Sequence, residues 1–320
     1  MSAAPLHRAP SGLSVVIPNY NGVKLLTDNL PSVFEALDGW DGEWEVIIVD
    51  DCSKDDSRAL IRDRFPRATL IENRQNLGFS KTCNIGMAAA RYPILLCINT
   101  DVKVSPNLPA LLVRHFSDPE LFAVSPRIIV ERESKNQGVV RGAYRKGFIK
   151  GSFAGSEEEV PARENLYAIG ACVAYHAGKF RALKGYSEVY TPYLFEDVDI
   201  CYRAWKRGWK SIYEPEATVW HYSNATLAKA KRRLNKRIYY RNRFLFHWAN
   251  LSDPGMLARN LLTTAFRLSV GWLWLNFLYY EAFFGALSRL KEVFAIRREE
   301  KKHRALGDAE VVRRAAGGAR

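Results

Sequence analysis

The sequence predicts an α/β protein built on a parallel sheet with helices on both faces, followed by a helical extension. From Leu13 onwards, short apolar runs alternate with amphipathic stretches, the pattern that forms such a sheet. Several of the runs end directly in polar residues, as buried strands do at the edge of a sheet. After residue 224 the alternation stops and a basic, aromatic-rich segment begins.

The composition is that of a folded protein with anionic partners. A chain of 320 residues can hold one large domain with an appendage or two modest domains. Its 48% hydrophobic and 25% charged residues exclude a disordered tail. The net charge of +13 favours nucleotide phosphates, nucleic acid or an anionic membrane face. The five cysteines form no C-x-x-C pair, which indicates a reduced, cytosolic protein without a disulfide framework or zinc knuckle.

The first strands follow a short lead-in. Residues 1–12 contain no apolar signal-peptide core and are expected to be flexible. Four strands are then predicted in "LSVVIP", "WEVIIVDD", "ATLIEN" and "YPILLCINTDV", and helices over 24–37, 55–65 and 80–91 follow the first three. Because open α/β sheets bind ligands beyond the carboxyl ends of their strands, the polar segments there are the candidate site.

The remainder of the predicted domain, 13–224, contains one irregular segment. Residues 131–165 are rich in Gly, Lys, Arg and Glu without a clean period, which predicts an insertion or a mobile loop. Such a segment acts as a lid in some proteins and is a plain surface excursion in others. The strand pattern resumes with "LYAIGACVAYH" and ends with "KSIYEPEATVWHY".

The extension over 225–305 is expected to be helical. It begins with a basic amphipathic helix that carries eight cations and no acid between residues 225 and 247. The run Leu268–Leu287 approaches the ~20 residues that span a bilayer, yet Glu281 would be costly in hydrocarbon. An interfacial helix with aromatic anchors is favoured over an internal or oligomer-packing helix and over a true span. Residues 306–320 are expected to form a disordered tail.

Two groups of acids near strand ends are candidates for chemistry. Asp50 and Asp51 are adjacent carboxylates that would repel unless something uses them, and they could accept hydrogen bonds from a nucleobase or a ribose. Asn99 and Asp101 are two apart after a buried strand and could grip Mg²⁺ or Mn²⁺ carrying a diphosphate. His221, alone on an aromatic stretch, would more often be structural.

A third group lies in "YLFEDVDICYRAWKRGW". Glu196 and Asp197 stand at a predicted helix start, where the helix dipole favours the ionised state that a general base needs. Asp199 precedes Arg203 by four residues and is expected to be a solvated, ion-paired acid.

Taken together, the ordered motifs resemble the family 2 glycosyltransferases with a GT-A fold. The motifs are "SVVIPNYNG", "VIIVDDCSKDDS", "NLGFSKTCNIG", "ILLCINTDV", "YLFEDVDICYRAWKRG" and "VWHY". The nearest branch is the rhamnosyltransferase-like one, which writes N-x-D for the family's D-x-D. The likeness covers about Leu13 to Tyr222, and "YYRNRFLF" looks like the helix that follows this domain. It implies a Rossmann-like mixed sheet.

The resemblance also implies roles for individual residues. Those expected to bind the nucleotide sugar are Pro18, Asn19, Tyr20, Asp50, Asp51, Asn76, Gly78 and Asn99. Asp101 would hold Mg²⁺ or Mn²⁺, and His221 would complete the metal or diphosphate site. Because an asparagine replaces the first acid of the motif, tight metal binding is less secure here. Asp197 would be the general base, and Glu196 would orient the acceptor or the base.

The expected function is metal-dependent, inverting transfer of a sugar from a dTDP-rhamnose or UDP-hexose type donor. The acceptor would be a hydroxyl of a glycan or lipid-linked glycan in surface polysaccharide synthesis. The enzyme would lie peripherally at the cytoplasmic face of the cell membrane, with a homo-oligomer left open. A polyprenyl-phosphate glycosyltransferase is the rival in the same fold. A catalytically dead relative also stays open, because Asn99 departs from the fuller motif. A non-catalytic nucleic-acid-binding protein is disfavoured, because it leaves Asp101, Asp197 and His221 unexplained.

Overall fold

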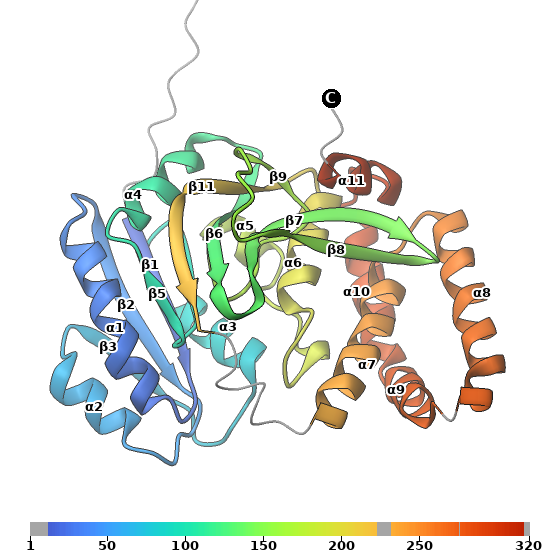
Figure 1. Ribbon diagram of the computed structural model, residues 1–320, viewed down its shortest axis with the longest axis horizontal. Helices are drawn as coiled ribbons and strands as arrows, with labels where there is room; N and C mark the ends of the chain where they lie inside the picture. The colour runs from blue at the N-terminus through green and yellow to red at the C-terminus, as the bar shows by residue number, and fades with distance from the viewer. Residues whose placement is uncertain (1–11, 223–231, 275, 317–320) are drawn as a thin grey trace, which may run out of the picture.

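The computed structural model describes residues 12–222, 232–274 and 276–316. The lead-in before Gly12 and the start of the basic segment, 225–231, lie outside the described residues. Figure 1 shows the sheet with its helices, coloured blue through green to yellow, on the left and in the centre, and the helices α7 to α10 on the right.

The N-terminal half is the predicted parallel sheet. Strand β1 pairs in parallel with β2 and β4, and β2 pairs in parallel with β3. The strands span Gly12–Asn19 (β1), Glu43–Asp50 (β2), Ala68–Glu72 (β3) and Ile94–Ile98 (β4). The connecting helices span Val23–Asp38 (α1), Ser57–Arg64 (α2) and Phe79–Ala89 (α3). The predicted alternation is therefore confirmed, with boundaries within a few residues.

The second half makes the sheet mixed. Strand β10 (Cys172–His176) lies antiparallel between β4 and β6 (Leu121–Val130), and β11 (Lys210–His221) runs parallel to β6. The short β5 (Val102–Val104) pairs antiparallel with the end of β11, so that Val102 lies opposite His221. The main order is β3-β2-β1-β4-β10-β6-β11-β5. The short helices are α4 (Leu108–Val113), η1 (Arg114–Ser117), η2 (Glu131–Glu133), α5 (Ala177–Ala182) and η3 (Glu188–Tyr190).

Residues 131–165 contain three strands, so the expectation of a loop without regular structure is wrong, whereas an insertion stays a prediction. Strands β7 (Lys135–Arg145) and β8 (Phe148–Gly155) make a hairpin paired with β6, and β9 (Arg163–Asn165) pairs with β11. Tertiary packing stabilises the hairpin, whose tip reaches the C-terminal helices (Figure 1). There, the Asn260 amide donates to the carbonyl of Gly147 at 2.7 Å, and the Tyr144 hydroxyl donates to that of Met256 at 2.7 Å.

The extension consists of several helices rather than one apolar rod. They are α7 (Arg232–Asn250), α8 (Pro254–Gly271), η4 (Trp272–Trp274), α9 (Phe277–Leu287) and α10 (Leu290–Lys301). The run 268–287 is thus divided between α8, η4 and α9. Within the described residues, none of the helices is both long enough and apolar enough to cross a bilayer. Glu281 on α9 pairs instead with Arg233 of α7 at 2.8 Å.

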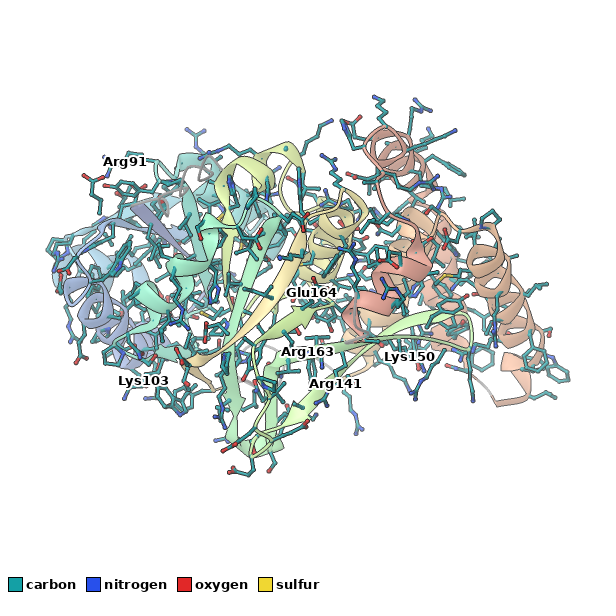
Figure 2. All side chains as sticks on the ribbon, turned by 90° about the horizontal axis from the view of Figure 1, so that it is seen from above. Arg91, Lys103, Arg141, Lys150, Arg163 and Glu164 are labelled. Carbon is teal, nitrogen blue, oxygen red and sulfur yellow. The ribbon has the colours of Figure 1, made fainter. Side chains whose placement is uncertain are left out.

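The tail expected to be disordered contains helix α11 (Asp308–Ala315), so that prediction is wrong for these residues. Asp308 is buried and anchors the helix to the domain. Its carboxylate accepts hydrogen bonds from the Tyr202 hydroxyl and the Lys206 ammonium, both at 2.7 Å. Seen from above in Figure 2, Arg141 and Arg163 lie near the middle of the molecule, between the sheet and the C-terminal helices. Arg163 donates a hydrogen bond to the carbonyl of Ala315 at 3.3 Å.

Helix α6 (Glu196–Lys206) links the sheet to the extension through buried charge. The side chains of Asp199 and Arg203 pair at 2.7 Å and are 0% and 4% exposed. The predicted pairing is confirmed, but Asp199 is buried rather than solvated. Two further donors, the Tyr190 hydroxyl at 2.8 Å and the Asn250 amide at 2.7 Å, bond to its carboxylate.

We expect Arg203→Leu to lower the free energy of unfolding by about 3–5 kcal/mol, because it leaves the buried Asp199 charge unpaired. Urea denaturation monitored by circular dichroism measures this. The matched control is Lys24→Ala in the exposed i, i+4 pair with Asp28, for which we expect less than about 1 kcal/mol. Similar losses in both variants would contradict a structural role for the buried pair.

Candidate active site

The first part of the site lies where β1 and β2 end. The Asn19 amide donates to Asp50 Oδ1 at 2.9 Å, and the Ser53 N–H donates to Asp50 Oδ2 at 2.9 Å. Asp50 is fully buried. Its carboxylate therefore holds the loop after β2, and direct contact of Asp50 with a nucleotide stays a prediction.

Asp51 organises the neighbouring loop, residues 73–78. Its Oδ1 accepts the N–H of Leu77 at 2.8 Å and the Asn73 amide at 2.8 Å, and its Oδ2 accepts the N–H of Gly78 at 2.9 Å. The exposed Asn76 contacts the carbonyl of Asp51 at 3.4 Å. Holding this loop is the role that the geometry shows, and contact of Asp51 or Asn76 with a nucleotide stays a prediction.

Gly78 brings that loop against the segment before α6. Its φ of +82° is in the left-handed region, and a Cβ there would lie 3.1 Å from the carbonyl oxygen of Pro192. The next N–H, of Phe79, donates to the same oxygen at 3.0 Å. At the carboxyl end of β1, Pro18 is half-buried and Tyr20 is 46% exposed. Both can be reached by a ligand at the carboxyl end of β1.

The N-x-D segment connects β4 to β5 and meets the end of β11. Asp101 Oδ1 lies 3.4 Å from His221 Nε2, so the structure brings together these two predicted metal ligands. His221 Nδ1 lies 3.2 Å from Gln137 Oε1. An amide oxygen accepts hydrogen bonds, so a proton on Nδ1 would satisfy this contact, and Nε2 would then be available to bind a cation beside Asp101. The buried Asn99 Oδ1 has no partner among the described residues.

These donors fit a divalent cation that a diphosphate helps to bind. The described residues contain no cluster of three or more His, Cys, Asp or Glu side chains suited to a metal. Mg²⁺ bound with nucleotides takes one or two protein carboxylates and completes its coordination with phosphate oxygens and water. Asp101, His221 and the unpartnered Asn99 oxygen match such a partial set.

The start of α6 is held in a strained conformation by a residue that the motifs did not identify. Leu194 and Phe195 have φ values of +74° and +83°, uncommon for residues with side chains. The buried Asn242 of α7 donates to the carbonyls of Tyr190, Tyr193 and Leu194 at 2.8, 2.9 and 2.8 Å. In the sequence, the polar Asn242 among the aromatic residues of α7 was the feature that could have identified this role. Asn242 thereby positions the acids that follow Phe195.

Asp197 and the N-x-D segment are linked through two consecutive residues. Asp197 Oδ2 accepts the N–H of Gly170 at 2.9 Å, and the carbonyl of Ala171 accepts the N–H of Asn99 at 2.9 Å. Asp197 Oδ1 accepts the N–H of Val198 at 2.8 Å. The half-buried Asp197 carboxylate is therefore connected to Asn99 by two backbone hydrogen bonds, although about a hundred residues separate the two in the chain. Gly170 and Ala171 were not predicted as site residues.

Burial decides the protonation of the two acids at the helix start. It raises the pKa of Glu196 to about 8, with the charge of Asp197 as the second cause. Burial also raises the pKa of Asp197, although the N–H groups of Gly170 and Val198 oppose this. The prediction that the helix dipole keeps both ionised is therefore wrong for Glu196. Because adjacent carboxylates do not readily share two charges, a protonated Glu196 leaves Asp197 as the charged member.

The sequence of this chain is similar to those of known glycosyltransferases. Residues 14–183 match the model of glycosyl transferase family 2. Poly-beta-1,6-N-acetyl-D-glucosamine synthase of Staphylococcus aureus is 26% identical over 220 residues, 65% of this chain and 49% of that protein. Pre-mycofactocin glycosyltransferase of Mycobacterium tuberculosis is 27% identical over 229 residues, 67% and 44% of the two chains. The chain thus spans about half the length of the curated relatives it matches.

Solved structures share the fold. TarS of S. aureus, residues 1–349 in complex with UDP-GlcNAc, has a TM-score of 0.56 at 15% identity and covers 96% of this chain and 90% of its own. Mannosyltransferase PcManGT from Pyrobaculum calidifontis, in complex with GDP-Man and Mn²⁺, has a TM-score of 0.55 at 16% identity, with 97% and 86% covered. The GT-A fold with C-terminal helices is thereby confirmed.

The raised pKa of Glu196 predicts a stability that falls with pH. Between its ordinary value of 4.5 and about 8, the folded chain binds a proton that the unfolded chain has lost. The resulting stabilisation is complete below pH 4.5 and is lost as the pH rises through about 8. We expect Glu196→Gln to flatten this decline by up to about 1.4 kcal/mol per pH unit.

Urea denaturation at several pH values across that window measures the decline. The exposed Glu35→Gln on α1 is the matched control and should keep the wild-type pH dependence. Equal pH dependence in wild type and Glu196→Gln would contradict a buried, protonated Glu196.

Proposed function

This chain belongs to glycosyl transferase family 2, and on that premise we propose that it transfers a sugar from a nucleoside diphosphate sugar to an acceptor hydroxyl, with inversion. The observation that carries the proposal is the link from Asp197 through Gly170 and Ala171 to Asn99. It puts a proton acceptor and the candidate diphosphate site on one edge of the sheet. The solved complexes of TarS with UDP-GlcNAc and of PcManGT with GDP-Man support a donor of this class.

In the proposed reaction, Asp197 is the general base. The acceptor hydroxyl gives its proton to the carboxylate as its oxygen bonds to the anomeric carbon. The bond from that carbon to the diphosphate breaks on the opposite face, which inverts the configuration. The raised pKa of Asp197 favours proton capture, since a carboxylate with a pKa nearer the working pH is the stronger base.

Asn99, Asp101 and His221 would hold a divalent cation at the diphosphate. Mg²⁺ or Mn²⁺ bound there would neutralise charge that develops on the leaving nucleoside diphosphate. The solved complexes of PcManGT and GalNAc-T7 contain Mn²⁺, which is consistent with this choice of ion. The neutral Asn99 supplies an oxygen without a charge, so the protein's own contribution to binding rests on Asp101 and His221.

Glu196 would act as a neutral positioning group. Its side chain is 7% exposed, and its buried Oε2 has no hydrogen-bond partner among the described residues. When protonated, it avoids a second charge beside Asp197 and can donate one hydrogen bond. It would therefore orient Asp197 or the acceptor while Asp197 takes the proton.

A dTDP-rhamnose or UDP-hexose donor and a surface polysaccharide or lipid-linked glycan acceptor are the specific substrates we propose. The N-x-D motif supports the rhamnosyltransferase-like branch, and the name of the poly-beta-1,6-N-acetyl-D-glucosamine synthase relative supports a polysaccharide context. A polyprenyl-phosphate acceptor is the alternative, because a phosphate oxygen needs no strong base.

The proposal leaves no role for nucleic acid, and the contacts of the basic helix support this. Arg233 of α7 pairs with Glu281 at 2.8 Å, and Arg241 donates to the carbonyl of Thr191. The guanidinium of Arg243 lies 4.5 Å from the ring centroid of Phe148. These three cations have partners within the protein, whereas Arg232, Lys236 and Arg237 of the same helix are exposed. Lys229 and Lys231 lie outside the described residues.

We further propose that α8, η4 and α9 rest peripherally on the cytoplasmic face of an anionic membrane. On α8 the usual amphipathic pattern is reversed: Asn260 and Thr264 are buried, whereas Leu262 and Phe266 are 71% and 65% exposed. Other exposed apolar side chains of this group are Leu261, Trp272, Leu273, Phe277 and Phe284. An outward apolar face suits a lipid interface, and the net charge of +13 favours anionic lipids.

A donor screen tests the transferase proposal. Release of nucleoside diphosphate is measured with UDP-, dTDP- and GDP-sugars, with and without Mn²⁺ or Mg²⁺. We expect turnover of one donor class that requires the metal ion. Asp197→Asn should lower kcat by about 10²–10⁴-fold and leave donor binding nearly unchanged, because it removes only the proton acceptor. The exposed Asp63→Asn on α2 is the matched control and should keep wild-type rates.

Each departure from that pattern has a distinct meaning. Failure to bind or turn over any of the donors would overturn the transferase proposal. Metal-independent turnover would remove the roles given to Asn99, Asp101 and His221. Wild-type rates in Asp197→Asn with polyprenyl phosphate as acceptor would favour the polyprenyl-phosphate alternative.

Vesicle sedimentation tests the membrane proposal. We expect Leu262→Ser combined with Phe266→Ser to weaken binding to vesicles that contain phosphatidylglycerol by at least about tenfold, because burying each apolar side chain is worth roughly 1.5–3 kcal/mol. Leu234→Ser with Phe294→Ser, two exposed apolar side chains on α7 and α10, is the control pair. Self-association without vesicle binding would instead assign this face to a homo-oligomer.

A further inference from the structure

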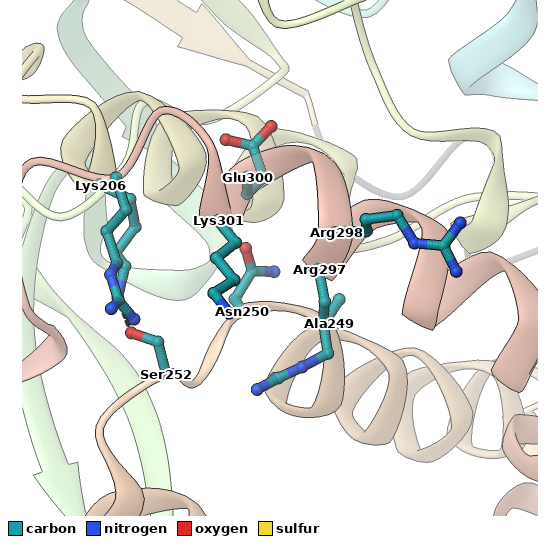
Figure 3. Close-up of a pocket in the computed structure, with 9 residues that line it drawn as sticks. Lys206, Ala249, Asn250, Ser252, Arg297, Arg298, Glu300 and Lys301 are labelled. Carbon is teal, nitrogen blue, oxygen red and sulfur yellow. Dashed lines mark hydrogen bonds between the residues drawn. The ribbon is translucent and has the colours of Figure 1, made fainter.

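A pocket of about 500 Å³ opens where helices α6, α7 and α10 end, in the part of the molecule shown in Figure 3. Its charged lining consists of Lys206, Arg297, Arg298, Lys301 and Arg304 with a single acid, Glu300. The volume lies within the roughly 300–1,000 Å³ of small-molecule sites. Lys206 is the last residue of α6 and Asp197 is the second, so the length of this helix separates the pocket from the candidate base by roughly 14 Å.

Two of the five cations hold the surrounding structure together. Lys206 Nζ pairs with Asp308 Oδ1 at 2.7 Å. Arg297 Nη1 donates to the carbonyls of Trp248 and Leu251 at 2.6 and 2.7 Å, where α7 ends. These contacts give Lys206 and Arg297 a structural role, and both form the inner wall of the pocket.

The acid of the pocket is already used. Both carboxylate oxygens of Glu300 accept hydrogen bonds from the Arg207 guanidinium, at 2.7 and 2.9 Å. Glu300 therefore does not neutralise the cations around it. Within the described part of the chain, Arg298, Lys301 and Arg304 have no side-chain hydrogen bond or ion pair to an acid, and all three are exposed.

The partial negative charges at the three helix C-termini offset only part of the positive charge that lines this pocket. Each C-terminus carries about half a negative charge, which cations at helix ends commonly complement. With Lys206 matched by Asp308, four arginine and lysine charges face about one and a half negative charges. An excess of about two to three positive charges is left, most of which a phosphate group of charge about −2 would neutralise.

The repulsion among these cations also favours an anion in the pocket. Burial lowers the pKa of Lys206 and of Arg297; the charge of Asp308 opposes this, whereas the charge of Arg304 lowers both pKa values further. An anion between these groups would relieve their mutual repulsion. Guanidinium groups also bind phosphate through two parallel hydrogen bonds, and three arginines line the pocket.

We propose that this pocket binds a phosphate-bearing ligand at a site separate from the candidate active site. The ligand's phosphate lies beside Lys301 and Arg304, with Lys206 and Arg297 behind it. The Arg298 guanidinium points away from Lys301 (Figure 3) and adds positive charge at the rim of the pocket. A soluble phosphate compound and the headgroup of a phospholipid share this chemistry. Binding does not depend on the transferase proposal, because none of these residues belongs to the sheet edge that carries Asp101 and Asp197.

Isothermal titration with inorganic pyrophosphate tests the site. The full chain is titrated with EDTA present and the ionic strength held constant with sodium chloride, which keeps general screening equal. The test variant combines Arg298→Gln, Lys301→Gln and Arg304→Gln. The matched control removes the same charge from exposed side chains of α1 and α2, through Lys24→Gln, Arg62→Gln and Arg64→Gln.

We expect the pocket variant to bind pyrophosphate at least tenfold more weakly than wild type, and the control to stay within about twofold. Equal thermal unfolding of the three proteins without ligand shows that the folds are intact. Equal weakening in both variants, or no binding by wild type, would overturn the proposal. A parallel sedimentation with phosphatidylcholine vesicles, with and without phosphatidylglycerol, identifies the source. Loss of vesicle binding in the pocket variant alone assigns the site to a lipid headgroup, whereas unchanged vesicle binding assigns it to a soluble phosphate.

Discussion

The burial of carboxylates along helix α6 is the constraint on which the rest of the structure depends. Asp197 bonds to the N–H of Gly170 beside the sheet, whereas Asp199 pairs with Arg203 and with Asn250 of α7. At the other end of the helix, Lys206 pairs with Asp308 of α11. Because an unpaired buried charge costs several kcal/mol, each of these groups requires its partner in place. One short helix therefore ties the sheet, α7 and α11 into one structure.

This arrangement makes the C-terminal helices part of the candidate active site. Asn242 of α7 satisfies three carbonyls of the segment before α6, and the left-handed Leu194 and Phe195 bring Glu196 and Asp197 to the helix start. Outer side chains of the same extension remain free for other contacts. The inner face of α9 buries Tyr279, Ala282 and Ala286, whereas α8 turns apolar residues outward. The extension thus serves positioning on one side, and on the other it offers the face that we assign to a membrane.

Protonation at the α6 start follows from the same packing. A helix N-terminus stabilises an anion by roughly 0.3–1 kcal/mol at an exposed site, whereas a shift in pKa from 4.5 to about 8 corresponds to several kcal/mol. Burial is therefore the larger effect at Glu196. The result distinguishes two neighbouring acids that look equivalent in the sequence: Glu196 is neutral, and Asp197 is the acid to which we assign the role of base in our proposal.

The sequence by itself determined the elements whose pattern is local. The buried strands β1, β2 and β4 show as apolar runs, and the polar residues after them identify the sheet edge that carries Asn99 and Asp101. Tertiary structure decided what depends on distant partners. Contacts with α8 hold strands β7 and β8 in place, and the burial of Asp308 holds helix α11 in place. Asp199 is buried because Tyr190 and Asn250 pack against it and donate hydrogen bonds to it. Spacing along the chain cannot report such contacts, since the desolvation and hydrogen bonding that control a buried charge are set by residues brought close only when the chain folds.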